Sequence, residues 1–161
     1  MINNKISLMI TLVILLLACN AKNTDSSVAD EVQVEAQVAK DIPFQIAQKY
    51  FLKTSVKQIA DPKIDSKEEF DALFGSATTM GEGGTPTEID FSKEYVIAIS
   101  KPENEFATVL HADKIVQHEA GELVVNYKVE VGPKQSYTSV PLLLLVVDKA
   151  IQGEIVLNEK K

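Results

Sequence analysis

Three stretches in the second half of the chain constrain its fold more than any other feature. Two of them, "YVIAIS" (95–100) and "LLLLVVD" (142–148), are continuous apolar runs of strand length. Such runs are typical of strands that are covered on both faces. The third, "LVVNYKVEV" (123–131), alternates apolar and polar residues, so one of its faces should contact water. The sequence therefore predicts strands in two environments, one buried on both faces and one wet on one side.

Three shorter segments, 107–111, 114–118 and 154–158, are further strand candidates. Turn-prone sequences separate the strands, namely "KPEN", "AD", "EAGE" and "DKAIQG". Connections this short favour hairpins over crossovers through helices. The sheet should therefore be mostly antiparallel.

One helix is predicted in "DSKEEFDALFG". Ser66 and Glu69 have the spacing of a capping box, which satisfies backbone donors at a helix start. Four apolar residues then share one face, with Gly75 as a plausible stop: Phe70, Leu73, Phe74 and Ala77. The segment 42–53 fits a helix and a strand equally well. The predicted fold class is α+β, a mostly antiparallel sheet of five to six strands with one or two helices packed on one face.

The first twenty residues, "MINNKISLMITLVILLLACN", carry one cation and a short apolar core from Ile6 to Leu17. A membrane span needs about 20 apolar residues, so this core predicts a secretory signal instead. Its end, Leu16-Leu17-Ala18-Cys19, resembles the bacterial lipobox. The resemblance implies that residues 1–18 are a lipoprotein signal peptide and that Cys19 is lipidated as the first residue of the mature chain.

Cys19 is the only cysteine, so a disulfide within the chain is excluded. The alternatives to lipidation are a buried core cysteine and a catalytic thiol, which would need a folded pocket with a nearby base. Asn20 follows the cysteine where an aspartate would resemble the signal for inner-membrane retention. We therefore expect an outer-membrane lipoprotein, and the sequence leaves open whether it faces the periplasm or the exterior.

The segment after Cys19 contains no aromatic residue, leucine or isoleucine up to residue 41. It has too little apolar surface to offset the entropy lost on ordering. Residues 19–41 are therefore predicted to be the lipidated cysteine and a flexible tether. Residues 42–161 are predicted to form a single α+β domain.

Composition limits the partners. The formal charge is −7, and all sixteen basic residues are lysines. Arginine supplies the planar fork that grips phosphates, and an acidic chain without it disfavours nucleic acid. The acyl anchor is therefore the expected link to the membrane, and no nucleic-acid partner is expected.

The glycine-rich stretch "MGEGGTPTEID" (80–90) has the spacing of neither a Walker loop nor a dinucleotide loop. Its two readings are a connector between helix and sheet and a loop that covers a ligand. Under the second reading, Glu82 and Thr85 are candidate binding residues.

No complete catalytic or metal motif is present. His111 and His118 are the only histidines, and a zinc site would need further ligands such as Asp113 or Glu119. Acid–base chemistry could recruit the carboxylates Asp65, Glu68, Glu69, Asp90 and Glu94. Glu69 already has a capping role, however, and Asp90 precedes a strand as a turn residue. We therefore expect no catalytic residue, no metal and no cofactor.

The polar stretch "KQSYTSVP" (134–141) precedes the most apolar strand. Tyr137, Thr138 and Ser139 offer a rigid ring and adaptable hydrogen bonds, which are typical of a binding edge. The other reading is a hairpin turn whose Tyr137 covers the rim of the core.

The order of "KIDSKEEFDALFG", a loop, "IDFSKEYVIAIS" and "SYTSVPLLLLVVDK" resembles the C-terminal domain of the PrcB type of protease-complex subunit over about residues 57–150. That family carries a glycine- and tyrosine-bearing stretch after the central strand, where this chain has "SKPENEFATVL". The resemblance implies an α+β domain and a protease-associated role. The whole chain also resembles small lipoproteins of the Bacteroides type.

These features predict a lipid-anchored cell-envelope protein with a non-catalytic binding or accessory domain that acts on protein or peptide partners. A modulator or inhibitor of an envelope protease is the first alternative, and it rests on the resemblance. A hydrolase that uses carboxylates near the 80–94 loop is the second.

Overall fold

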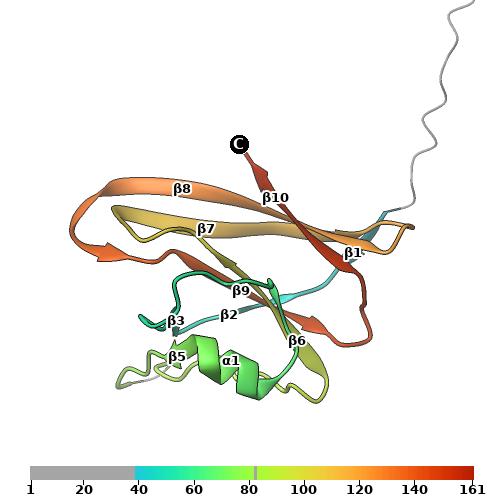
Figure 1. Cartoon of the computed structure of the whole chain (residues 1–161), viewed down its shortest axis with the longest axis horizontal. Helices are drawn as coiled ribbons and strands as arrows, with labels where there is room; N and C mark the ends of the chain where they lie inside the picture. The colour runs from blue at the N-terminus through green and yellow to red at the C-terminus, as the bar shows by residue number, and fades with distance from the viewer. Residues whose placement is uncertain (1–38, 82) are drawn as a thin grey trace, which may run out of the picture. The chain divides into compact units, whose positions relative to one another are not determined.

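The computed structural model describes residues 39–81 and 83–161, which form a β-rich domain with one helix (Figure 1). The predicted signal peptide, Cys19 and the tether up to residue 38 lie outside the described residues, as does Glu82. The first strand begins at Lys40, two residues before the predicted start of the domain.

The centre of the fold is one long antiparallel hairpin that bends in the middle. Its first arm runs through β6 (Glu94–Ser100) and β7 (Asn104–Gln117), and its second through β8 (Glu122–Ser139) and β9 (Leu142–Asp148). β7 pairs with β8, and β6 pairs with β9. We call residues 100–104 and 139–142 the bend, because both arms pass there from one sheet to the other. The Lys101 N–H donates to the Pro141 carbonyl at 3.1 Å and ties the two arms together.

Each half of the hairpin forms the middle of a four-stranded sheet. The outer sheet has the order β1-β7-β8-β10, with β1 (Lys40–Ile42) and β10 (Glu154–Lys160) at its edges. The central sheet has the order β2-β9-β6-β4, with β2 (Gln45–Ala47) and β4 (Lys63–Ile64) at its edges. A two-stranded sheet joins β3 (Tyr50–Leu52) to β5 (Phe74–Ser76). Among the described pairs, only β8 with β10 is parallel.

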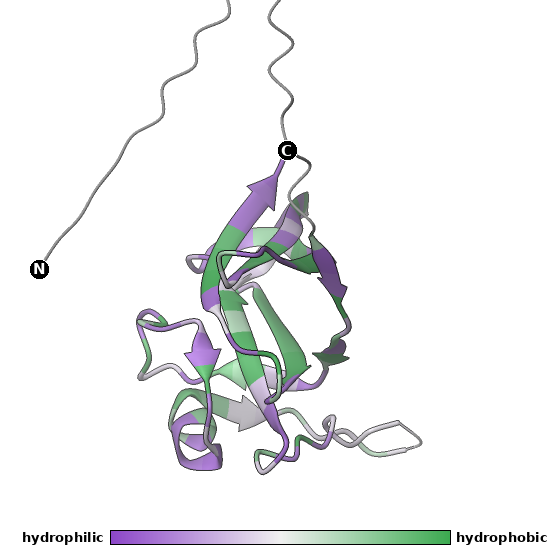
Figure 2. Cartoon of the chain, turned by 90° about the vertical axis from the view of Figure 1, so that its right-hand side faces the viewer, coloured by the Kyte–Doolittle hydropathy of each residue, from purple (hydrophilic) through white to green (hydrophobic). Residues whose placement is uncertain are grey.

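The central sheet is the middle of three layers (Figure 1). One of its faces packs on the outer sheet, and the other packs on α1 (Lys67–Leu73) with β3 and β5. Alternate residues of β6 accordingly enter different cores: Tyr95, Ile97 and Ile99 face the outer sheet, and Val96 and Ala98 face the helix. Figure 2 shows these strands as the apolar interior of the domain. The predicted strands covered on both faces are confirmed.

The helix forms where the capping box predicted it. The Ser66 side chain accepts from the Glu69 N–H at 3.2 Å, and Phe70 is the buried residue of the helix. The Phe70 ring lies 5.0 Å from Tyr50, 4.8 Å from Phe74 and 5.4 Å from Phe91, measured between ring centroids. Aromatic pairs at this spacing stabilise beyond the area that they bury. The helix therefore anchors the third layer.

Gly75 does not end the helix as predicted, because α1 ends at Leu73 and the chain continues directly into β5. The reason for glycine is a close approach within the small sheet. A Cβ at this position would lie 2.4 Å from the Phe51 ring. Gly75 is therefore a packing residue of a strand.

The coarse fold class is confirmed as antiparallel-rich with a helix, but the strand count and the single sheet were wrong. Within residues 39–81 and 83–161, ten strands in three sheets replace five or six in one, because the central hairpin folds over on itself. The ambiguous segment 42–53 contains the end of β1 and the short strands β2 and β3.

The predicted turn at "AD" was also wrong, since β7 runs unbroken from Asn104 to Gln117. Ala112 pairs with Tyr127 and Lys114 with Asn126, so Asp113 is an extra residue in the ladder. Such a bulge changes which alternate residues face the core. Leu110 faces inward before it and Ile115 after it. In the sequence pattern, the bulge therefore looks like a break between two strands.

One polar residue on the predicted wet face of β8 is buried. Asn126 is 6% exposed, and Asn158 of β10 donates from its side-chain amide to the Asn126 Oδ1 at 2.8 Å. The two asparagines are register partners in the parallel pair. This hydrogen bond satisfies an oxygen that is shielded from water.

Candidate functional site

Two cavities and three exposed apolar side chains, those of Phe106, Val131 and Tyr137, lie near the bend at one end of the domain. β1 pairs with residues 115–117, at the opposite end of β7. A strand rises about 3.3 Å per residue, so roughly 40 Å separate the entry of the chain from the bend. The segments 101–103 and 140–141 thus lie far from the point where residue 39 joins the fold.

The larger cavity at this end has a volume of about 580 Å³, and we call it the bend cavity. It lies between the segment 52–58, which follows β3, and the bend. Leu52, Val56 and Val140 supply its apolar lining, and Thr54, Gln58 and Ser100 supply neutral polar groups. Sites for small ligands have volumes of about 300–1,000 Å³ and this mixture of surfaces.

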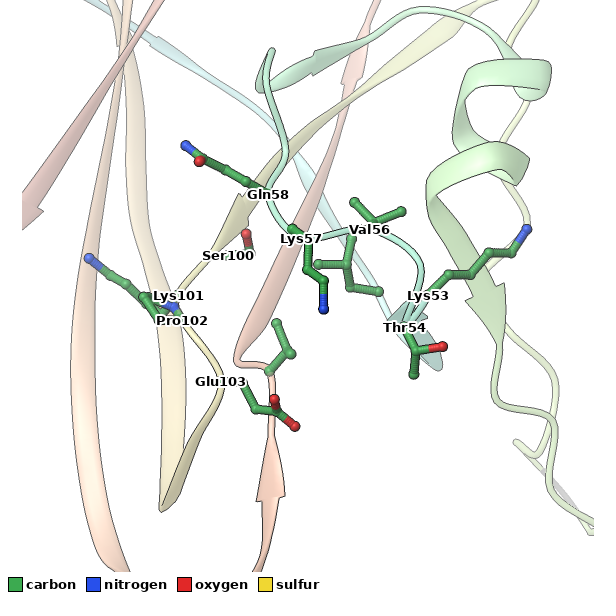
Figure 3. Close-up of a pocket in the computed structure, with 11 residues that line it drawn as sticks. Lys53, Thr54, Val56, Lys57, Gln58, Ser100, Lys101, Pro102 and Glu103 are labelled. Atoms are coloured by element: carbon green, nitrogen blue, oxygen red, sulfur yellow. The ribbon is translucent and has the colours of Figure 1, made fainter.

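Charged side chains around the bend cavity point in different directions (Figure 3). Lys53 turns away and donates to the Asp71 carbonyl on α1. Lys101 also turns away, toward Glu159 of β10, and the ion pair raises the pKa of its ammonium group. The amine of Lys57 and the carboxylate of Glu103 point toward the cavity. These two groups are therefore available to a bound molecule.

A shallower hollow of about 340 Å³ lies on the other side of the segment 101–104. Its apolar lining comes from the β7–β8 ribbon, with Phe106, Val129 and Val131. Phe106 is 43% exposed and Val131 is 63% exposed. The same bend segment therefore separates a mixed cavity from an apolar hollow.

The ribbon leaves these side chains exposed because its neighbours are short. β1 pairs only with residues 115–117 of β7, and β10 pairs only with residues 122–128 of β8. The remaining length near the bend is two-stranded, so both of its edges lack a neighbouring strand among the described residues. Free edges expose backbone donors and acceptors to another chain.

The predicted binding residues of the 134–141 stretch lie at this end. Tyr137 is 62% exposed, so it does not cover the core rim. The Thr138 hydroxyl donates to the Glu103 carboxylate at 2.6 Å. Ser139 pairs with Asn104 in the ladder. The expected hairpin turn was wrong, since β8 continues to Ser139, but the polar residues do adjoin the bend.

The residues predicted in the glycine-rich loop do not join them. Thr85 is exposed and lines neither of the two cavities. Glu82 lies outside the described residues. The loop connects β5 to β6, and Thr87 within it accepts from Tyr50 through its carbonyl at 2.6 Å.

Three of the carboxylates considered for acid–base chemistry, Asp65, Asp90 and Glu94, have local partners. Asp90 accepts from the Ser92 hydroxyl and N–H at 2.5 and 3.0 Å and pairs with Lys93 at 3.0 Å. These contacts, the Ser92 hydroxyl first, lower the pKa of Asp90 from 3.8 to about 2. Its carboxylate organises the turn that leads into β6 and remains ionised at neutral pH.

The two histidines are not brought together as a site. The His111 Nε2 lies 3.0 Å from the Glu130 carboxylate across the β7–β8 ladder. His118 instead lies at the hairpin turn, where its backbone N–H donates to the Glu122 carbonyl at 2.9 Å. Across residues 39–81 and 83–161, no group of three or more potential metal ligands is present. In the same ranges, no helix has the length and apolar character to span a membrane.

Sequence reasoning missed the bend cavity because its walls come from three distant segments. Val56 and Lys57 follow β3, Ser100 and Glu103 flank the end of β6, and Val140 precedes β9. The signal in the sequence was indirect: "KPEN" (101–104) and "SVP" (139–141) each interrupt one arm of the hairpin. Pairing those interruptions would have located the bend.

Comparisons with protein families, curated proteins and solved structures found no match to the chain. The resemblance to the PrcB type and to the Bacteroides-type lipoproteins therefore stays a prediction from sequence.

Proposed function

We propose that this chain is a lipid-anchored protein of the cell envelope whose domain binds a protein or peptide partner without catalysing a reaction. Cys19 carries the anchor in this proposal, and the bend end carries the binding surface. The observation that supports it most is the clustering of two cavities, exposed apolar side chains and unpaired strand edges around the bend.

The chemistry of this surface suits a polypeptide. Phe106, Val131 and Tyr137 offer exposed apolar area, and aromatic side chains dominate the energetics of many interfaces. Unpaired edges of the ribbon offer backbone hydrogen bonds that a strand of another chain can complete. A partner that covered both would bury apolar area and satisfy backbone groups together.

The position of the surface suits an anchored protein. The described chain enters the fold next to Gln117, and the bend lies at the other end of β7. A tether that joins at the entry end leaves the bend free of the attachment point. The proposed destination is the outer membrane.

A cross-linking experiment tests the binding surface. A photo-reactive phenylalanine analogue replaces Tyr137 at the bend or Glu119 in the hairpin turn, both of which are exposed. We expect a discrete adduct with one partner from Tyr137 in intact cells and none from Glu119. Equal labelling from both positions, or none from either, would contradict the proposed surface.

The nature of the partner distinguishes general binding from protease modulation. The resemblance to the PrcB type supports an envelope protease as that partner. Identification of the Tyr137 adduct by mass spectrometry separates the two. A purified chain that turned over a substrate, and lost turnover when one carboxylate was replaced, would overturn the non-catalytic proposal.

A further inference from the structure

The bend cavity has an apolar floor with one cation directed at it. Leu52 is buried, Val56 and Val140 are half-buried, and together they offer a surface for an aliphatic group. The Lys57 amine points into the same space (Figure 3). Among the described residues, Lys57 has no ion-pair partner.

The charged residues that line the cavity have a net charge opposite in sign to that of the whole chain. The whole chain has a formal charge of −7, yet three lysines and one glutamate line this cavity: Lys53, Lys57, Lys101 and Glu103. Lys53 and Lys101 are engaged by neighbouring oxygens but still contribute to the local potential. The lining of the cavity therefore favours an anionic group.

Glu103 sets a limit on this attraction. One of its oxygens accepts the 2.6 Å hydrogen bond from Thr138, which holds the carboxylate at the edge of the cavity. An anion beside Lys57 would be repelled by it. A ligand amine would be attracted instead, so the sign of the effect of Glu103 separates the two classes of ligand.

We propose that the bend cavity binds a carboxylate that is joined to an apolar group, with Lys57 as its counter-ion and Leu52, Val56 and Val140 around the apolar group. The C-terminus of a peptide with an aliphatic last residue has this chemistry, and so does a small free aliphatic acid. The inference rests on the proposed function, because it names the chemical group that the bend would recognise.

Calorimetric titration of the full chain in mild detergent tests the inference with three probes. They are acetyl-Ala-Ala-Leu with a free carboxylate, the same peptide as its carboxamide, and 4-methylpentanoate. We expect the free-carboxylate peptide to bind at least about tenfold more tightly than the carboxamide, because an ionic hydrogen bond exceeds a neutral one. Tighter binding of the peptide than of 4-methylpentanoate identifies a peptide terminus, and equal binding identifies a free acid.

Four variants locate the effect. Lys57→Gln should weaken binding of the carboxylate about fivefold to tenfold and leave the carboxamide unchanged. Lys128→Gln, an exposed lysine on the outer sheet, is the matched control and should change neither. Glu103→Gln should tighten carboxylate binding a few-fold. Val140→Ser should weaken the binding of both peptides.

Three results would overturn the inference. They are equal binding of carboxylate and carboxamide, an unchanged affinity in Lys57→Gln, and no heat from either acid at about 10 mM, where even a Kd of 1 mM would be detected. Weaker carboxylate binding in Glu103→Gln would also overturn it, since removal of a negative charge from the cavity edge should favour a bound anion. A Tyr137 adduct obtained beside such results would leave the proposed function standing and remove only this inference.

Discussion

The two halves of the bent hairpin differ in what covers them. Both faces of the β6–β9 pair are buried, one face against the outer sheet and the other face against the helix layer. β7 and β8 contact the core on one face only, and near the bend they also lack neighbouring strands. One hairpin therefore supplies both strands that are buried on two faces and strands that are accessible near the bend.

This difference assigns separate tasks to strands that are continuous in sequence. Substitutions in the central sheet should act through stability, whereas substitutions near the bend should act through binding. Four sets of measurements test that contrast, in order of decreasing expected effect.

Replacement of a valine by lysine should distinguish the two halves of the hairpin most strongly. Val146 on β9 is 4% exposed within the core beneath the helix, and Val131 on β8 is an exposed valine near the bend. Val146→Lys buries an unpaired charge and should lower the free energy of unfolding by more than about 4 kcal/mol. Val131→Lys should change it by less than about 0.5 kcal/mol. Urea unfolding followed by circular dichroism measures both, and equal midpoints would contradict the contrast.

Truncating a leucine should give the next largest difference. Leu145 on β9 is fully buried, whereas Leu157 on β10 is 39% exposed at the edge of the outer sheet. Leu145→Ala should lower the free energy of unfolding by about 3 kcal/mol, because it removes apolar contacts and leaves a cavity. Leu157→Ala should lower it by less than about 1 kcal/mol. A larger loss from Leu157→Ala than from Leu145→Ala would show that the edge of the outer sheet is packed more tightly than the central sheet.

The asparagine pair tests a hydrogen bond in which the buried Asn126 accepts from the exposed Asn158. Asn158→Ala removes the donor at 2.8 Å from the Asn126 Oδ1 and should lower the free energy of unfolding by about 1–2 kcal/mol. Replacing both asparagines with valine removes donor and acceptor together, and it should restore part of that loss. Thermal unfolding of the single and double variants measures the difference. A double variant less stable than the single one would contradict this account of the pair.

The smallest effect concerns the turn before β6 and depends on pH. The pKa of Asp90 is lowered to about 2 from 3.8, so its ionised form stabilises the fold above about pH 4. That contribution is lost as the pH falls from about 4 toward 2, because the unfolded state takes up a proton in this range before the folded state does. Asp90→Asn should lower the Tm slightly at pH 7, and the difference from the natural chain should shrink near pH 2. A difference that stayed constant across this range would remove the carboxylate from the explanation.

The sequence pattern predicted the strands whose environment is uniform along their length. β6 and β9 are buried on both faces throughout, so their apolar runs matched the structure closely. The helix start was predictable because the Ser66 cap is a local interaction. β10 was predicted as a short strand. Its parallel pairing with β8 was not predicted, because it depends on a tertiary contact.

The failures have physical causes that local patterns do not reveal. The Asp113 bulge changes the alternation within one strand and therefore looked like two strands with a turn. One reading of the polar stretch 134–141 was a hairpin turn, but β8 continues as an extended strand through residues 134–139. Of the candidate site, Tyr137, Thr138 and Ser139 lie beside the bend, whereas Lys57 and Val140 became visible only once distant segments were brought together.

The bent hairpin also has a consequence for how the domain folds. Its two arms meet in the short turn 118–121, where Gly121 adopts a φ of +88° and the Gly121 N–H donates to the His118 carbonyl at 2.9 Å. Closing a short loop loses less chain entropy than joining distant segments. We therefore expect the ladder to start at this turn and to extend outward through the bend, so that the strands of both large sheets are laid down from one nucleus. The edges β1, β2, β4 and β10 then join in later steps.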